Sequence, residues 1–82
     1  SIYNPKTLKL LDKELADLYD DMALMSSAMY DSLYYRSKKD NLLFNEKYKV
    51  VKQLYKKIGI RMTEITEISQ NPDKPIHDDD DD

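Results

Sequence analysis

The sequence predicts an all-α protein in which two long helices form an antiparallel, coiled-coil-like hairpin. Two stretches of the 82-residue chain repeat apolar residues at alternating spacings of three and four, the pattern of a helix that packs along one stripe. A polar segment, residues 36–41, separates the two stretches. The presence of a single glycine also disfavours an all-β fold, whose turns need several. We expect one domain, residues 1–70, followed by an acidic tail, residues 71–82.

The first helix is predicted over residues 5–36. Asn4 is a suitable N-cap, and Pro5 suits the first helical position, where a missing N–H costs nothing. The apolar stripe then continues through three heptads and comprises Leu8, Leu11, Leu15, Leu18, Met22, Met25 and Met29. The charged residues between these positions predict a polar outer face made of Asp12, Lys13, Glu14, Asp17, Asp20 and Asp21.

The second helix is predicted over residues 41–69. Ser37 and Asp40 could open it as a capping box, and Asp40 or Asn41 alone could equally serve as the cap. Its apolar stripe comprises Phe44, Tyr48, Val51, Tyr55, Ile58, Met62 and Ile65, with Leu54 and Ile68 widening it on one side. We expect the two stripes to pack against each other in a seam between the helices, with Tyr48 and Tyr55 in it. The helix is expected to end at Asn71, because the residue before a proline resists the helical conformation.

Gly59 interrupts the second helix, where glycine costs about 1 kcal/mol relative to alanine. A turn centred on residues 37–40 pairs residues whose numbers add to about 77, as in any antiparallel hairpin of helices. This pairing places Gly59 opposite Leu18 and Tyr19. The glycine therefore either makes room for a large side chain of the first helix or is simply tolerated.

The competing architecture is one unbroken helix of about 65 residues that pairs with a partner chain. The apolar stripe shifts by one residue across the polar segment, which favours the hairpin. Because a two-helix hairpin covers each stripe on one side only, we expect dimerisation into a four-helix bundle. The candidate interface is formed by tyrosines outside the strict stripe: Tyr19, Tyr30, Tyr34 and Tyr35.

The composition excludes most catalytic and metal-binding chemistry. With no cysteine, one histidine and one glycine, the chain lacks the residues for a disulfide, a Cys-ligated zinc, a His pair or a Gly-rich phosphate loop. Asp17, Asp20 and Asp21 lie close enough on one helix to share a cation, but nothing predicts a pocket that would separate their pKa values. We expect them to form a solvated acidic face. We also expect no catalytic residue, metal or cofactor, and no enzyme activity.

The charge distribution is uneven, although the net charge is only −3. Residues 36–61 carry nine basic and two acidic side chains, while residues 62–82 carry one basic and eight acidic ones. Candidate contacts to the phosphates of a nucleic acid are therefore Lys38, Lys39, Lys49, Lys52 and Lys56. The same lysines could instead keep the helix soluble and pair with the acidic first helix. The run Asp78–Asp82 predicts a disordered tail.

The sequence favours a non-enzymatic helical interaction or adaptor module that binds or modulates a protein partner. The alternative is a small nucleic-acid-binding accessory factor for replication, repair or transcription, whose acidic tail competes internally for the basic second helix. In size and composition the chain is similar to small helical-hairpin accessory proteins, including those encoded by bacteriophages, although no motif identifies a family.

The chain carries no sign of a membrane or secretory segment. No apolar run approaches the ~20 residues that a membrane span needs, and no signal-peptide pattern opens the sequence. We therefore expect a soluble cytoplasmic protein without a membrane partner, in the host cytoplasm if a phage encodes it.

Overall fold

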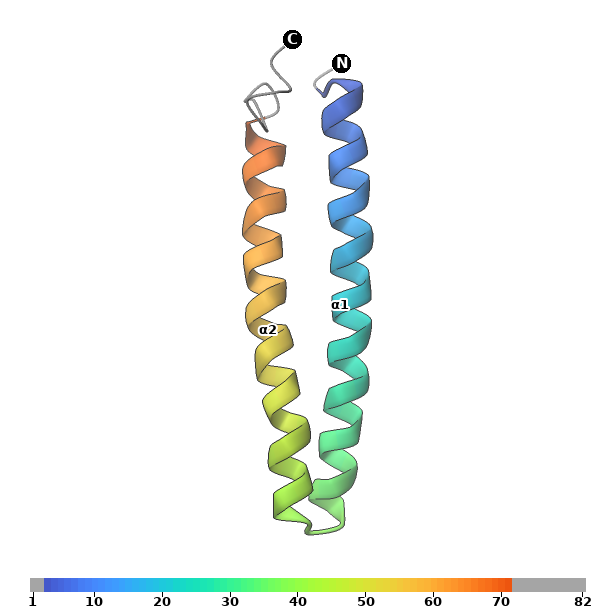
Figure 1. Cartoon of the computed structure of the whole chain (residues 1–82), viewed down its shortest axis with the longest axis vertical. Coiled ribbons are helices and arrows are strands. Elements are labelled where there is room, and N and C mark those ends of the chain that lie inside the picture. Colours follow the sequence, from blue (N-terminus) through green and yellow to red (C-terminus); the bar gives the residue numbers. More distant parts are fainter. Residues whose placement is uncertain (1–2, 72–82) are drawn as a thin grey trace.

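The computed structural model describes residues 3–71, which form two helices, α1 (Pro5–Ser37) and α2 (Asn41–Gln70). The helices lie side by side and antiparallel, so the turn is at one end of the hairpin and the start of α1 and the end of α2 are at the other (Figure 1). The predicted all-α hairpin is confirmed, and no strand occurs within residues 3–71. Apart from Asn71, the tail that was predicted to be disordered lies outside the described residues.

The hairpin is 57 Å long but only 20 Å by 18 Å across. Its section is the width of two helices, so each side chain either lies between the helices or faces outward. Within residues 3–71, only four apolar side chains are buried: Leu11, Ala28, Val51 and Ile58. The core is therefore a narrow seam between α1 and α2, and most of the surface of each helix faces outward.

The first turn of α1 forms as predicted. The side chain of Asn4 accepts a hydrogen bond from the backbone N–H of Thr7 at 2.8 Å, and Pro5 is the first helical residue. At the start of α2, Asp40 is the N-cap, and its carboxylate accepts a hydrogen bond from the backbone N–H of Leu43 at 3.1 Å. Of the candidate caps, Asp40 is thus the one observed.

The predicted capping box with Ser37 is wrong, because α1 continues through that residue. The Ser37 hydroxyl donates to the carbonyl of Tyr34 in its own helix, at 2.6 Å. The chain then reverses at Lys39, whose φ of +58° lies in the left-handed region. The N–H of Lys39 bonds to the carbonyl of Arg36, and the N–H of Asp40 bonds to the carbonyl of Tyr35, each at 3.0 Å. This is a Schellman motif with lysine in the position that glycine usually occupies.

The seam contains one heptad-spaced line of residues from each helix. On α1 the line comprises Thr7, Leu11, Glu14, Leu18, Asp21, Met25, Ala28 and Ser32, all buried or half-buried. On α2 it comprises Phe44, Lys47, Val51, Leu54, Ile58, Arg61, Ile65 and Ile68, also buried or half-buried. Both lines keep the expected spacing of three and four, but each takes in only half of the predicted apolar stripe.

The prediction that the whole stripe packs in the seam is therefore wrong. Leu11, Leu18 and Met25 lie in the seam as expected, whereas the alternate members of both stripes are exposed: Leu8, Leu15, Met22 and Met29 on α1, and Tyr48, Tyr55 and Met62 on α2. Each stripe is two rows wide, and a single partner helix covers one row. The rest of the seam is filled by small side chains such as Ala28 and Ser32 and by charged side chains that pair with one another.

Five charged residues meet in the seam and at its border, contrary to the predicted solvated acidic face. Asp21 is only 5% exposed, and its Oδ2 atom lies 3.2 Å from Nε of Arg61. The same guanidinium lies 3.2 Å from Glu14 Oε2 and 3.4 Å from Asp17 Oδ2. Lys57 Nζ lies 3.4 Å from the second oxygen of Asp21. Two cations from α2 therefore neutralise the charge of the carboxylates that are shielded from solvent in the folded hairpin.

This cluster fixes the register of the hairpin. Arg61 contacts residues between 14 and 21, and the predicted pairing places it opposite Ala16, so the register agrees with the expectation. A slip of one helix along the other would leave a buried charge without a partner, which is how buried charged groups specify register. Asp20 takes no part in the cluster and is exposed.

Gly59 does not make room for a side chain of α1. A Cβ atom at this position would have no neighbouring atom within 4 Å, apart from its own helix backbone and chain neighbours. The packing of the hairpin therefore leaves the presence of a mid-helix glycine unexplained.

Candidate functional site

The exposed rows of the two stripes lie on the same side of the hairpin and form one surface, here named the apolar face. It comprises Leu8, Leu15, Met22 and Met29 from α1 and Tyr48, Tyr55 and Met62 from α2. In an antiparallel helix pair, the two rows that flank one side of the seam come from the same heptad position of each helix. The exposed rows of α1 and α2 meet this condition. Their exposed fractions run from 37% for Met29 to 72% for Tyr55. Scattered apolar residues are ordinary on a surface, but a contiguous patch along both helices is typical of a binding site.

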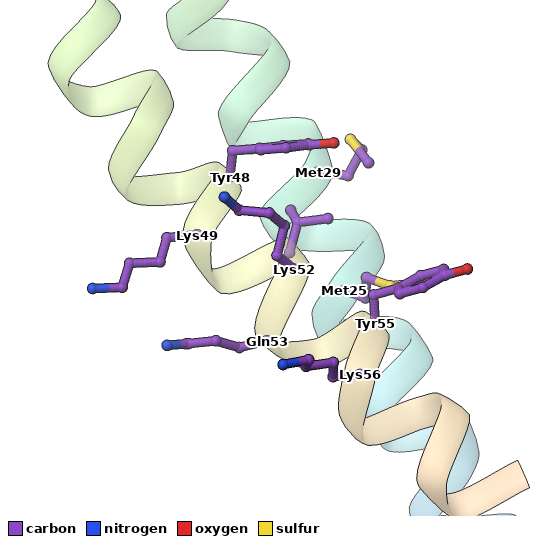
Figure 2. A pocket seen from close by; sticks show the side chains of 9 residues that line it. Met25, Met29, Tyr48, Lys49, Lys52, Gln53, Tyr55 and Lys56 are labelled. Atoms are coloured by element: carbon purple, nitrogen blue, oxygen red, sulfur yellow. The ribbon is translucent and has the colours of Figure 1, made fainter. Parts of the chain in front are cut away.

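An open pocket of about 800 Å³ lies towards the turn end of this face, where Met25, Met29, Tyr48, Val51 and Tyr55 form its apolar lining. Figure 2 shows both tyrosine rings extending towards the side where α1 presents its methionines. The two tyrosines are one heptad apart, or about 10 Å along the helix. Buried Val51 lies between them in the sequence. The arrangement resembles the holes that receive single side chains of a neighbouring helix in a coiled coil.

Three of the predicted lysine contacts border this pocket. The ammonium of Lys52 lies 5.6 Å from the ring centroid of Tyr48, a cation–π contact. Lys49 and Lys56 also line the pocket, but their side chains extend away from the methionines (Figure 2). Within residues 3–71, the α2 cations that form ion pairs with acidic side chains of α1 are Lys57 and Arg61. In the described part of the chain, none of these ion pairs involves Lys49, Lys52 or Lys56.

The other two predicted lysines lie in the turn, away from this pocket. Lys38 places its ammonium 5.5 Å from the ring centroid of Tyr34, and Lys39 is the left-handed residue. Tyr34 in turn packs edge to face against Tyr35, with ring centroids 5.2 Å apart. The structure therefore divides the five candidate lysines between the turn and the middle of α2.

The candidate interface tyrosines also lie in different places. Tyr19, 68% exposed, follows Leu18 of the seam and precedes Met22 of the apolar face by one turn, so it borders that face. Tyr30 and Tyr34 are exposed on other sides of α1, and half-buried Tyr35 continues the line of the seam. Tyr48 and Tyr55 were not predicted as surface residues, because both belong to the apolar stripe. The signal was present in Leu54 and Ile68, which make the α2 stripe wider than one partner helix can cover.

The described residues offer little for other kinds of site. No group of three or more His, Cys, Asp or Glu side chains within residues 3–71 is placed to hold a metal ion. Neither helix is long and apolar enough to cross a membrane over the same range. No family model, curated protein or solved structure matches this chain.

Proposed function

We propose that this chain is a non-enzymatic interaction module that associates with other helices through the apolar face. The observation that carries the proposal is the balance of apolar side chains. Four are buried within residues 3–71, whereas the seven of the apolar face are each more than a third exposed. Burial of apolar surface is the main favourable term in protein association, at roughly 25 cal/mol per Å². Binding of a partner that covers this face is therefore favoured by the burial of apolar surface that the hairpin alone leaves exposed.

The shape of the face supports a macromolecular partner. A side of the hairpin 57 Å long and 20 Å wide has a footprint of about 1,000 Å², against about 800 Å² per partner in a standard interface. Small-molecule sites instead enclose most of their ligand, whereas this face is an open surface along two helices. Tyr48 and Tyr55 near its turn end are of the residue type that most often dominates binding energy.

A second copy of the chain is one such partner. When two hairpins pack face to face, the exposed apolar rows of all four helices point to the centre of a four-helix bundle. The second row of each stripe is then covered, which accounts for stripes that are two rows wide. Dimerisation is thus the form of association that we propose first, with a different helical protein as the other kind of partner.

Paired substitutions on opposite sides of α1 test the proposal. Met22→Glu places a charge in the apolar face, and Leu24→Glu places the same charge two residues away, outside that face. Both side chains are exposed in the hairpin, at 43% and 58%, so neither variant should unfold it. We expect Met22→Glu to weaken association by at least about tenfold, because an unpaired carboxylate would have to be buried, and Leu24→Glu to weaken it much less. Size-exclusion chromatography with light scattering measures this, and circular dichroism checks the helices. Equal effects of the two variants would contradict the proposal.

Nucleic-acid binding is the second candidate function, favoured by the lysines that border the pocket. Lys49, Lys52 and Lys56 could contact phosphates while Tyr48 stacks on a base. The net charge of −3 counts against it, because most nucleic-acid-binding domains are basic overall. Titration of labelled single- and double-stranded DNA and RNA at low salt decides the matter, since electrostatic contacts are strongest there. If binding occurs, deletion of residues 77–82 should tighten it by removing a competing anion.

A further inference from the structure

Gly59 borders the apolar face and has open space above it. It lies one heptad after Lys52, which lines the pocket, so the two residues occupy the same row along the edge of α2. A β-carbon at Gly59 would meet no atom within 4 Å. Glycine is among the poorest helix formers, and nothing inside the hairpin requires it here. The glycine is explained if a second molecule packs against this edge. Because glycine has no side chain, another helix or a large side chain can approach the backbone of α2 closely here.

Tyr19 occupies the matching place on the opposite edge of the face. It is 68% exposed and lies in the α1 row that borders the face, as Gly59 does in α2. The two residues are also at the same height along the hairpin. Their numbers add to 78, as do those of the ion pairs Asp17–Arg61 and Asp21–Lys57 that cross the seam. The hairpin thus carries an exposed ring on one edge and, level with it on the other, a position with open space and no side chain, here named the notch.

We propose that the apolar face is occupied by a second copy of this chain, with α1 of each protomer against α2 of the other and both turns at the same end. This arrangement rests on the proposed function and specifies its partner. A twofold axis parallel to the helices brings opposite edges of the two faces together at equal height. Tyr19 of each protomer then packs over Gly59 of the other, so one contact occurs twice, as an isologous interface requires.

The charges of the helices favour this arrangement over the other twofold dimer, in which like helices pack together and the turns lie at opposite ends. On the α2 side of the pocket lie Lys49, Lys52 and Lys56, none of which takes part in the ion pairs across the seam among residues 3–71. Packing α2 against α2 would bring Lys56, near the middle of that helix, close to its own copy. Packing α1 against α2 places each α2 diagonally across the bundle from its own copy, so these lysines stay apart and only the α2–α2 pairing is penalised.

A distance between the two turns distinguishes these arrangements. The chain has no cysteine, so Lys38→Cys carries a single spin label at the turn. Pulsed electron–electron double resonance should give an intermolecular distance of about 20–30 Å, as expected for neighbouring helix ends in one bundle. A distance near the 57 Å length of the hairpin would overturn this arrangement but leave the association itself standing. The absence of any intermolecular distance would overturn both. Dilution with unlabelled chain is the control, because it should remove the signal.

The contact between Tyr19 and Gly59 has its own test. Gly59→Leu fills the notch and should weaken dimerisation about tenfold or more, because the tyrosine can no longer pack there. Adding Tyr19→Ala to the same chain should recover part of that loss, which a general disturbance of the helix would not allow. Thr63→Leu, four residues along on an exposed position of α2, is the matched control and should leave the dimer unchanged. An unaltered dissociation constant for Gly59→Leu would overturn the contact.

Discussion

The guanidinium of Arg61 crosses the seam to Asp21, with 3.2 Å between Nε and Oδ2, at a site where the aspartate is only 5% exposed. Glu14 shares the same guanidinium. Buried ion pairs add little net stability, since desolvation offsets their attraction, but removal of one partner leaves an uncompensated charge. The cluster therefore sets the register of the two helices more than it stabilises them.

Arg61→Leu should be the most damaging single substitution in this cluster. It leaves Glu14 and Asp21 without their main cation in a poorly hydrated place, so the urea midpoint should fall sharply. Lys13→Ala removes an exposed cation that pairs with Asp17 at 3.0 Å, and should change the midpoint only slightly. Circular dichroism during urea unfolding measures both variants. Replacing Glu14, Asp21 and Arg61 together by leucine should recover the loss, and failure to recover would contradict this account of the cluster.

Stability should fall in acid partly through Asp17. The hydrogen bond from Lys13 lowers the pKa of Asp17 below its ordinary value of 3.8, with the charges of Lys13 and Arg61 adding to it and partial burial opposing. Because the folded pKa lies below the unfolded one, the contribution is complete above pH 3.8 and is lost as the pH falls through the folded value. Asp17→Asn should flatten this part of the profile of urea midpoint against pH. If the urea midpoint of Asp17→Asn falls at low pH as much as that of the unmodified chain, Asp17 is not a source of the acid sensitivity.

Lys39→Gly should stabilise the hairpin. A residue with a β-carbon is strained at a φ of +58°, whereas glycine adopts that conformation freely. We expect a gain of about 0.5–1 kcal/mol after the greater flexibility of glycine in the unfolded chain is counted. Lys38→Gly is the matched control, because φ is −85° there and glycine brings no relief. Chemical denaturation of both variants measures the difference, and a loss of stability in Lys39→Gly would contradict the strain.

Gly59→Ala should have opposite effects on folding and on association. In a chain kept monomeric by Met22→Glu, alanine should raise the free energy of unfolding by about 1 kcal/mol, since its β-carbon meets nothing within 4 Å. In the unmodified chain the same methyl group should weaken the dimer, because it enters the notch for Tyr19. Thermal unfolding at low and high chain concentration separates the two effects. A gain of stability at both concentrations would mean that the edge of α2 is free in the dimer.

Much of the fold could be predicted from the sequence, because local signals fix it. Asn4 and Pro5 mark the start of α1, the polar segment marks the turn, and heptad spacing gives two helices whose register agrees with the contacts of Arg61. The cap at Asp40 was one of three alternatives, and the hydrogen bond to Leu43 decides among them.

The rotation of each helix about its own axis could not be predicted in the same way. The rows through Leu11 and through Leu15 are both apolar, so hydrophobic spacing does not say which one meets the partner helix. The choice depends on whether Glu14 and Asp21 can find a cation across the seam, which is a property of two helices together. Arg61 supplies that cation, and the row through Leu15 is left exposed. For the same reason Tyr48 and Tyr55 were expected in the core and are found on the surface.

The mass of the unmodified chain in solution tests the central claim most directly. Sedimentation equilibrium over micromolar concentrations should show a reversible rise from the 9.7 kDa of one chain to twice that mass. Such a rise is expected because two apolar faces cover one another when hairpins pair. A constant mass of one chain across the whole range would contradict self-association through the apolar face.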